Sequence, residues 1–427
     1  MQLYKHQIDA LERTKDFNRV AYYHDMGLGK TFTGAEKLKR LNANVNLVIC
    51  QKSKVKDWLE HFETHYKNCY VVNDLTNKEQ YQNFLTYARV LNNGSSIQHV
   101  GVINYDLVFR RVDLLKLKEF TLLLDESSMI QNLTAKRTKT ILKLNAKNVI
   151  LLSGTPIAGK YENLYSQLRL LGWEISNRDY WDQFINYRLE YYNSCPFGVK
   201  AVTGYKNVGM LKSILKNYGA DFIKSEEVLT LPEQNFNVVS CEISKEYTKF
   251  MRDKIITIND EELIGDNQLT QLLYARMLCG AYNKDKLQAF SDLITSSNDR
   301  FIVFYNFNCE LEVLLQKIDN RPYSLVNGQV KDLTNYENES NSITFVQYQA
   351  GAMGLNLQHK ANKMIYFSLP LSSELFEQSK KRIHRIGQKQ SCFYYIMMCR
   401  GSVEEKIYKT LLKRNDYTQK LFEKDFI

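Results

Sequence analysis

The sequence predicts an α/β protein with two lobes, each built around a parallel β-sheet. In the first half of the chain, short apolar or β-branched runs alternate with amphipathic stretches of helical period, and this alternation returns after about residue 300. The residues between these two regions lack this alternation of strands and helices. Because strands that alternate with helices form parallel βαβ units with both sheet faces covered, the pattern indicates two such sheets with helical segments between them.

In the first lobe, the alternation defines five strands and three of the helices that connect them. The expected strands are Val20–Tyr23, Val45–Cys50, Val100–Ile103, Thr121–Leu124 and Val149–Leu152. The expected helices are Lys54–Tyr66, Lys78–Leu91 and Ala135–Leu144, where apolar residues recur at helical spacing.

In the second lobe, the expected strands are Phe301–Phe304, Ile343–Val346, Lys363–Phe367 and Phe393–Met398. Residues 177–229 and 244–293 lack regular strand spacing and predict mainly helices. Pro232 interrupts the chain between the two regions, so we place the lobe boundary there. Lobe 1 then spans 1–230 with a helical insertion from about 177, and lobe 2 spans 231–427 with a helical insertion over about 244–293.

Composition excludes several classes of protein. The chain has 427 residues, 44% hydrophobic and 24% charged, unlike a peptide or a disordered protein. Eight cysteines without a C-x-x-C pair argue against a disulfide framework and a zinc knuckle. No run approaches the ~18 apolar residues of a membrane span. We therefore expect a soluble cytoplasmic protein with no membrane partner.

The charge and the residue usage add two weaker indications. A net charge of +10 fits a polyanionic partner, although a solvated surface would give the same value. Abundant Lys, Asn, Ile and Tyr with only 5 Pro suggest A/T-rich coding DNA, and hence a bacterial or phage-infected host cell.

A phosphate-binding loop follows the first expected strand. Residues His24 to Thr31 read His-Asp-Met-Gly-Leu-Gly-Lys-Thr and lead directly into a helix. In such a loop, backbone N–H groups and the helix dipole face an anion, the lysine (Lys30) reaches the β- and γ-phosphates, and Thr31 ligates Mg²⁺. His24 occupies the first glycine position of the G-x-x-x-x-G-K-[ST] pattern, so an ordinary glycine-rich turn is the alternative.

A pair of carboxylates ends a later strand. Asp125 and Glu126 follow Leu122-Leu123-Leu124, at the edge of a parallel sheet where ligands bind. Asp125 would hold Mg²⁺ and Glu126 would orient and deprotonate the attacking water. The alternative is a helix N-terminal cap.

Further motifs follow in a definite order. In the first half they are Tyr4–Gln7, Asp25–Thr31, Val48–Ser53 with Trp58, Asp125–Ser128 (motif II) and Ser153–Pro156 (motif III). In the second half they are Ala350–Leu357 (motif V) and Gln378–Gln388 (motif VI). With these residues in this order, the chain resembles the Swi/Snf-type branch of the superfamily 2 helicases, which are double-stranded-DNA translocases.

The resemblance implies two RecA-like lobes with ATP in the cleft between them. The implied ATP-binding residues are Gln7, Met26, Gly27, Leu28, Gly29, Lys30, Thr31, Gly354, Arg382 and Arg385. Catalysis would rest on Lys30, Asp125 and Glu126, with Arg382 and Arg385 as arginine fingers. Thr31 and Asp125 would hold Mg²⁺. A basic helix on the protein surface is the alternative for the two arginines.

The resemblance also implies a DNA-tracking face and a closing helix over about 403–425. Candidate phosphate contacts are Lys52, Ser53, Asn104, Tyr105, Asn306 and Asn356, for which ordinary surface polarity is the alternative. Three segments depart from the family pattern. Ser127-Ser128 replaces Ala-His, which puts the coupling of motif II to motif III in doubt. Ile223-Lys-Ser-Glu226 replaces a pair of arginines, and Asn327-Gly328-Gln329 in the motif IV region lacks the expected arginine, which puts some DNA contacts in doubt.

Two other patterns have simpler explanations. His61 and His65 lie one helical turn apart without a third ligand, so we expect a solvated helix face in place of a metal site. Several tyrosines could stack on bases, although packing between helices is the simpler expectation. They are Tyr161, Tyr165, Tyr180, Tyr187, Tyr191 and Tyr192.

We therefore predict a DNA-dependent ATPase that moves along double-stranded or branched DNA and remodels DNA or protein–DNA complexes. One alternative is a strand-separating or branch-migrating helicase, which would need a strand-splitting hairpin, and the sequence shows no clear candidate. A second is a non-hydrolysing DNA-binding scaffold, suggested by Ser127-Ser128. The sequence indicates no particular protein partner.

Overall fold

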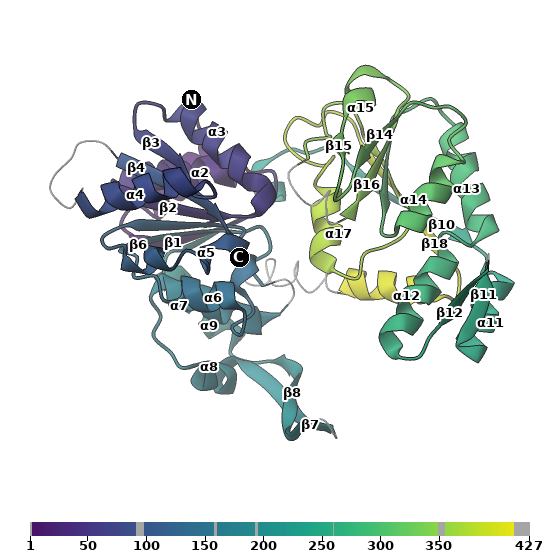
Figure 1. Ribbon diagram of the computed structural model, residues 1–427, viewed down its shortest axis with the longest axis horizontal. Coiled ribbons are helices and arrows are strands. Elements are labelled where there is room, and N and C mark those ends of the chain that lie inside the picture. Colours follow the sequence, from purple (N-terminus) through teal and green to yellow (C-terminus); the bar gives the residue numbers. More distant parts are fainter. Residues whose placement is uncertain are drawn as a thin grey trace. The chain divides into compact units, whose positions relative to one another are not determined.

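The computed structural model describes residues 2–90, 98–157, 160–192, 195–258, 260–348 and 355–413. It separates into two compact units, lobe 1 up to Val228 and lobe 2 from Leu229 (Figure 1). Each unit contains a largely parallel seven-stranded sheet with helices. The predicted two-lobed α/β fold is therefore confirmed.

Lobe 1 contains a fully parallel sheet with the strand order β3-β4-β2-β5-β6-β1-β9. The strands are β1 (Arg19–His24), β2 (Val45–Cys50), β3 (Tyr70–Asp74), β4 (Gln98–Asn104), β5 (Thr121–Asp125), β6 (Asn148–Leu152) and β9 (Ala220–Ile223). The central strands β2 and β6 are buried at every residue. Continuous burial is typical of a parallel sheet that is covered on both faces.

The helices of lobe 1 pack on both sides of this sheet (Figure 1). They are α1 (Lys5–Arg13), α2 (Lys30–Leu41), α3 (Val55–His65), α4 (Lys78–Val90), α5 (Tyr105–Val108), α6 (Lys136–Ile141), α7 (Tyr165–Leu171), α8 (Asn177–Phe184), α9 (Val208–Asn217) and α10 (Ser225–Val228). Helix α2 lies very close to the sheet, because a Cβ atom added at Gly34 would be only 2.8 Å from Cδ1 of Leu152. This glycine therefore lets the helix after β1 approach the core.

The predicted helical insertion from about 177 contains strands over residues 185–192 and 195–205. Here β7 (Ile185–Tyr192) and β8 (Cys195–Tyr205) form an antiparallel hairpin between α8 and α9. The sequence does carry the signal, because Tyr187, Leu189 and Tyr191 alternate with polar residues at the period of a strand. The sequence analysis had found no clear candidate for a strand-splitting hairpin, and β7–β8 supplies a candidate.

Lobe 2 contains a sheet with the order β10-β18-β17-β13-β16-β14-β15, parallel except for the pair β14–β15. The strands are β10 (Gln234–Cys241), β13 (Phe301–Tyr305), β14 (Tyr323–Val326), β15 (Lys331–Asp332), β16 (Ile343–Gln347), β17 (Lys363–Tyr366) and β18 (Cys392–Cys399). Alternate residues of β13 belong to two hydrophobic clusters, one containing Val303 and the other Phe304. Both faces of this sheet are therefore buried.

The helices of lobe 2 are α11 (Lys245–Asp253), α12 (Gln268–Cys279), α13 (Lys284–Thr295), α14 (Asn308–Leu315), α15 (Thr334–Asn338) and α17 (Ser373–Lys380). The expected helical insertion over 244–293 also contains a short antiparallel hairpin of β11 (Ile255–Ile258) and β12 (Glu261–Ile264). Residues 403–413 are helical, and the rest of the expected closing helix lies outside the described residues. In the described part of the chain, no helix has both the length and the apolar character needed to cross a membrane.

Candidate active site

The predicted motifs of lobe 1 meet at one edge of its sheet. Strands β5, β6 and β1 are parallel neighbours, so their carboxyl ends lie side by side. The loops that follow them carry Asp125-Glu126, the Ser153–Pro156 motif and the glycine loop. This is the edge at which open α/β sheets bind ligands.

The glycine loop has the backbone of a phosphate cradle. Gly27 and Gly29 have φ angles of +89° and +71°, which a residue with a Cβ adopts only at a cost. Gly29 is the N-cap of α2, so Lys30 is the first residue of the helix. Lys30 Nζ donates hydrogen bonds to the carbonyls of His24 at 3.0 Å and Asp25 at 3.3 Å. The loop therefore curls around the lysine amine at a helix N-terminus, where anions bind.

Motif III lies directly against this loop. A Cβ atom added at Gly154 would lie 3.0 Å from Cγ of Met26 and 3.3 Å from Nζ of Lys30. The next residue, Thr155, donates its backbone N–H to Oγ of Ser153 at 3.2 Å. A glycine at position 154 therefore leaves the lysine amine room to move.

Asp125 is held by groups from two other elements. Trp58 Nε1 of α3 donates to Asp125 Oδ2 at 2.8 Å, and the Tyr105 hydroxyl donates to the Asp125 carbonyl at 3.0 Å. Burial raises the pKa of Asp125, although the hydrogen bond from Trp58 and the charge of Lys30 act in the opposite direction. The raised pKa marks a carboxylate that has lost solvation and would gain from a bound cation.

Glu126 has an unusual backbone and a specific partner. Its φ of +58° lies in the left-handed region, which is uncommon for a residue other than glycine and frequent at functional sites. Ser153 Oγ donates a hydrogen bond to Glu126 Oε1 at 3.2 Å. Motif III thus orients the carboxylate that we predicted to be the general base.

Ser127 connects motif II to motif III through a residue that the sequence analysis missed. Its hydroxyl donates to Oε1 of Gln167 at 2.7 Å, and the amide of Gln167 donates to the carbonyl of Pro156 at 2.7 Å. Tyr23 of β1 donates to the same Oε1 at 3.1 Å. The Ala-His to Ser-Ser departure therefore leaves a hydrogen-bonded route between the two motifs through Gln167.

Gln7 also lies beside the glycine loop. Its Nε2 donates to the carbonyls of Leu28 at 3.2 Å and Gly29 at 3.1 Å, and its Oε1 accepts the backbone N–H of Tyr4 at 2.9 Å. His6 Nε2 lies 3.0 Å from the Leu28 carbonyl. The N-terminal helix therefore supports the loop from outside the sheet.

An ion pair between the half-exposed Arg13 and the buried Asp221, behind the glycine loop, was not predicted. His24 Nε2 lies 2.8 Å from Oδ2 of Asp221 in β9, and Arg13 Nε donates to the other oxygen, Oδ1, at 2.6 Å. Burial lowers the pKa of His24 despite its contact with Asp221. Ser225, just after β9, donates its hydroxyl to Asp25 Oδ2 at 2.9 Å. Strand β9 and the turn after it therefore fix both residues that begin the loop.

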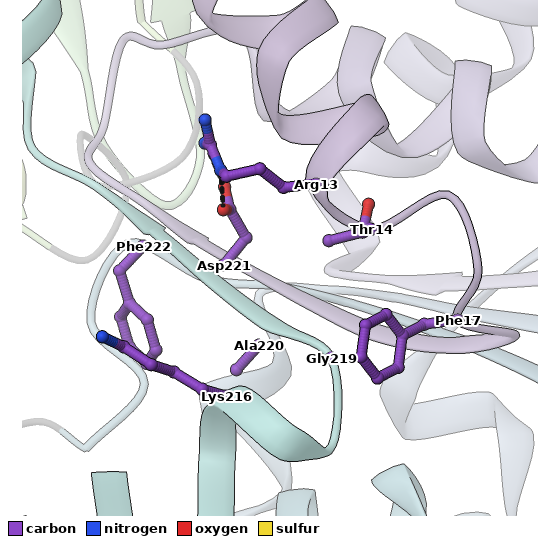
Figure 2. Close-up of a pocket in the computed structure, with 8 residues that line it drawn as sticks. All are labelled: Arg13, Thr14, Phe17, Lys216, Gly219, Ala220, Asp221 and Phe222. Carbon is purple, nitrogen blue, oxygen red and sulfur yellow. Dashed lines mark hydrogen bonds and ion pairs between the residues drawn. The ribbon is translucent and has the colours of Figure 1, made fainter. Parts of the chain in front are cut away.

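A cavity of about 330 Å³ adjoins this ion pair. Figure 2 shows Arg13 and Asp221 facing each other beside the end of α1 and strand β9. The lining residues are Arg13, Thr14, Phe17, Lys216, Gly219, Ala220, Asp221 and Phe222. None of them belongs to the motifs that surround Lys30.

The predicted DNA contacts of lobe 1 fall into two groups. Lys52 and Ser53 are exposed in the short 3-10 turn after β2. Asn104 instead caps α5 by accepting two backbone N–H groups, and Tyr105 is 1% exposed with its hydroxyl bonded to the Asp125 carbonyl. Both side chains therefore make their bonds inside the lobe, and a DNA contact of Asn104 or Tyr105 stays a prediction.

In lobe 2, motifs V and VI come together. Arg385 Nη1 donates to Oδ1 of Asn356 at 2.6 Å, and Arg382 Nη1 donates to the Leu355 carbonyl at 3.4 Å. Arg382 is 8% exposed, and burial lowers the pKa of Arg385. Helix α17 ends at Lys380, so both arginines lie in the turns that follow it. Gly354 lies outside the described residues.

The remaining predicted contact, Asn306, follows β13. Its side-chain amide donates to Ser368 Oγ at 2.8 Å and to the Leu369 carbonyl at 3.1 Å. These bonds join the carboxyl ends of β13 and β17. Asn306 therefore supports the shape of this edge, and its amide hydrogens are directed into the lobe.

The two histidines of α3 differ in exposure, since His61 is buried and His65 is exposed. His61 is 8% exposed and packs edge-on against Phe32 of α2 with ring centroids 4.6 Å apart, while His65 lies 5.0 Å away. Burial and the neighbouring His65 lower the pKa of His61 to about 4. His61 is thus an uncharged packing residue between α2 and α3, and the expected solvation of this face holds for His65 alone.

Lobe 2 contains a buried ion pair beside two cysteines. Lys286 Nζ lies 2.7 Å from Oε1 of Glu404, and their side chains are 0% and 3% exposed. Within the described residues, Glu404, Cys279 and Cys399 form the one group with metal-ligand spacing. Burial is the largest single effect and lowers the pKa of Lys286, but the Glu404 carboxylate and the two cysteines together outweigh it and raise the pKa. A charged lysine thus occupies the position of a cation beside Glu404.

Comparison with known protein families assigns the chain. Residues 15–286, more than half of the sequence, match the SNF2-related domain, and residues 285–387 match the helicase conserved C-terminal domain. The chain belongs to the SNF2-related family. The resemblance that the motifs indicated is therefore confirmed.

Two curated relatives of this SNF2-related chain illustrate the similarity. The SWI/SNF-related matrix-associated actin-dependent regulator of chromatin subfamily A-like protein 1 of Xenopus tropicalis is 21% identical over 425 residues, covering 93% of this chain and 42% of the relative. The chromodomain-helicase-DNA-binding protein 1-like of Mus musculus is 24% identical over 442 residues, covering 93% and 47%. The chain thus spans about half the length of the curated relatives it matches.

Among solved structures, the chain is similar to the Sulfolobus solfataricus SWI2/SNF2 ATPase core in complex with dsDNA. The two are 19% identical, and the match covers 99% of this chain and 93% of that chain with a TM-score of 0.43.

Proposed function

We propose that this SNF2-related chain is a DNA-dependent ATPase that couples ATP hydrolysis to movement along double-stranded DNA and to remodelling of DNA or protein–DNA complexes. The observation that carries the proposal is the continuity of the site in lobe 1. Position 154 lies against the Lys30 amine, and Ser153 beside it donates a hydrogen bond to Glu126. Phosphate-binding and water-activating groups thus occupy one edge of the sheet, as phosphoryl transfer requires.

The donor set fits a magnesium–triphosphate complex. Asp125 and Thr31 supply the oxygen ligands that Mg²⁺ prefers, and a cation would offset the cost of burying Asp125. In this proposal Lys30 binds the β- and γ-phosphates and Glu126 orients and deprotonates water. Bound Mg²⁺ neutralises charge on the phosphates. Gln7 contributes by holding the glycine loop through the carbonyls of Leu28 and Gly29.

Arg382 and Arg385 would complete the site when the two lobes close around ATP. Their place within the matched helicase C-terminal domain, on turns joined to Asn356, supports this role. A guanidinium group stabilises the charge on the γ-phosphate only when it lies beside that phosphate. Hydrolysis would therefore follow closure of the two lobes. Binding of ATP by Gly354 remains part of the proposal.

Two observations support DNA as the track. The chain carries a net charge of +10, and exposed Lys52 and Ser53 offer phosphate contacts that do not depend on base sequence. A relative's name, chromodomain-helicase-DNA-binding protein 1-like, points the same way.

Phosphate release tests the proposal. The rate of phosphate release from ATP is measured without DNA and with single-stranded DNA, linear duplex or four-way junctions. In the natural sequence, linear duplex should increase this rate. Lys30→Ala and Glu126→Gln should each lower the stimulated rate by about 10²-fold or more. Lys39→Ala, a change of the same type at an exposed position in α2, should leave it unchanged. Absence of stimulation by any DNA would reject the proposal in favour of a scaffold.

A strand-separating or branch-migrating helicase is the second candidate, because the β7–β8 hairpin is the kind of element that it requires. Displacement of the third strand of a triplex, compared with unwinding of a forked duplex, separates the two functions. Unwinding without triplex displacement would favour the second. The scaffold alternative loses its support, because Ser127 retains a link to motif III through Gln167.

A further inference from the structure

The β7–β8 hairpin projects from lobe 1 beyond helix α8, at the lower edge of Figure 1. Its two strands pair with each other and with no third strand. A two-stranded hairpin gains little stability from its own backbone pairing. We therefore expect its exposed side chains to have a role other than stabilising the hairpin.

One face of the hairpin is apolar and largely exposed. Tyr187 and Leu189 point to the same side because they alternate along β7, and they pair directly with Val202 and Lys200 of β8. The pairing register shifts after Glu190, but Tyr191 reaches the same side, because a Cβ added at Gly198 would meet both Tyr191 and Leu189. Tyr191 is 68% exposed and Leu189 is 47% exposed. The ring of Tyr191 lies over Gly198, where an added Cβ would be 3.1 Å from it. Exposed apolar side chains that gather on a projecting element indicate a contact surface.

The charge on this face is positive. Lys200 Nζ lies 4.2 Å from the ring centroid of Tyr187 and 4.8 Å from that of Trp181 in α8. In the described part of the hairpin, the one carboxylate is that of Glu190, which is on the opposite face and paired with Arg188 at 2.6 Å. The apolar face therefore combines aromatic rings with a cation and has no hairpin carboxylate to repel an anionic partner.

We propose that this face, formed by Trp181, Tyr187, Leu189, Tyr191 and Lys200, binds unpaired DNA bases at a branch point. The inference rests on the proposed function, because it names the DNA structure that the same motor engages. Aromatic side chains stack on the flat faces of bases without regard to sequence, and a nearby cation attracts the adjoining phosphate. An intact duplex presents mainly its phosphates to a protein. A face with a single lysine would neutralise few of them and would bind a duplex weakly.

The base of the hairpin is tied to the segment that follows motif III. The Tyr180 hydroxyl of α8 donates to the Tyr161 carbonyl at 2.7 Å, and the Tyr205 hydroxyl of β8 donates to Glu162 at 2.9 Å. Tyr180 is fully buried. Movement of motif III with the state of the nucleotide would therefore move the hairpin, which couples the base contact to the hydrolysis cycle.

Binding measurements on the full chain test the inference. A forked DNA with unpaired arms is compared with a blunt duplex of the same length, without ATP. The natural sequence should bind the fork more tightly, and Tyr191→Ala and Leu189→Ser should each weaken fork binding by about 5-fold or more while leaving duplex binding unchanged. Val199→Ser is the matched control, since Val199 is 48% exposed and pairs with Glu190 on the opposite face.

Equal affinity for fork and duplex in the natural sequence would overturn the inference, as would equal losses on both DNAs in Tyr191→Ala, which would indicate a duplex contact. Unchanged fork binding in both variants would also overturn it and would favour a protein partner for this face. These outcomes are independent of the ATPase test, because stimulation by linear duplex could fail or succeed while the fork preference is measured without ATP.

A photo-crosslinking amino acid at position 191 provides a measurement that does not depend on loss of binding. We expect crosslinks to the unpaired arms of the fork and none to its duplex stem. Crosslinks confined to the stem would overturn the inference.

Discussion

The hydroxyl of Ser153 donates a hydrogen bond to Oε1 of Glu126 across 3.2 Å. This bond joins the ends of the adjacent strands β5 and β6, and it restrains the one carboxylate of the pair whose backbone is in the left-handed region. Ser153 is fully buried, so water does not replace the bond. Orientation of Glu126 therefore depends on motif III.

Ser153→Ala should lower kcat and leave KM for ATP nearly unchanged. The serine holds the proposed base and does not bind the substrate. Its loss should lower the rate by about 10-fold or more, because a hydrogen bond to a charged carboxylate is worth about 1.5–3 kcal/mol. Steady-state phosphate release with saturating duplex DNA measures both constants. An increase in KM with unchanged kcat would show that Ser153 acts in nucleotide binding.

Trp58→Phe should move the acidic limb of the kcat/KM profile towards higher pH. Burial already raises the pKa of Asp125, and the Trp58 N–H lowers it, so removing this donor raises the pKa further. Asp125 would then become protonated at a higher pH, and the enzyme would lose activity at that pH. The kcat/KM profile reports the free enzyme. A shift to lower pH, or none, would contradict the role of Trp58.

Gly154→Ala should weaken ATP binding while leaving the free energy of unfolding nearly unchanged. The added methyl group would lie 3.3 Å from the Lys30 amine and 3.0 Å from Met26, so the lysine must shift. Gly209→Ala is the control, since nothing lies within 4 Å of that position in helix α9. Gly209→Ala should add about 0.5–1 kcal/mol of stability without affecting ATP. Fluorescent-nucleotide titration and urea unfolding measure the two effects.

Lys286→Met should destabilise lobe 2 by about 3–5 kcal/mol, because it leaves the Glu404 carboxylate buried without its cation. The double variant Lys286→Met with Glu404→Leu should recover most of this loss, since a buried pair is often replaced by apolar residues at little cost. Urea unfolding of the full chain measures both. A double variant as unstable as the single one would show that packing, and not charge, dominates at this site.

The sequence identified the parts of the fold whose signals are local. Strands such as Val45–Cys50 are continuous apolar runs because both faces of the parallel sheet are buried, and that pattern needs no knowledge of the neighbours. Strand β3 was missed because its burial is interrupted, with Val71 41% exposed. The hairpin was missed because its alternation is bounded by no Asn-Gly or Asp-Gly turn.

The residues of the candidate site that could be predicted are also those with a local sequence signal. Lys30, Asp125 and Glu126 belong to short motifs that follow strands, so their shared edge could be inferred from the strand order of the chain. Gln167 and Asp221 lie far along the chain from the residues that they hold, and no local pattern marks them. The bond of Tyr105 could not be predicted, because a polar residue after a strand looks the same in the sequence whether its hydroxyl faces solvent or the Asp125 carbonyl.

The place of β9 in the sheet has a consequence for biosynthesis. Strand β1, which leads into the glycine loop, pairs with β6 on one side and with β9 on the other. During translation its outer hydrogen-bonding edge stays bare until residues 220–223 leave the ribosome, long after the motifs themselves have been made. Any truncated product that stops earlier displays the apolar run Val20–Tyr23 on an unprotected edge, a template for aggregation.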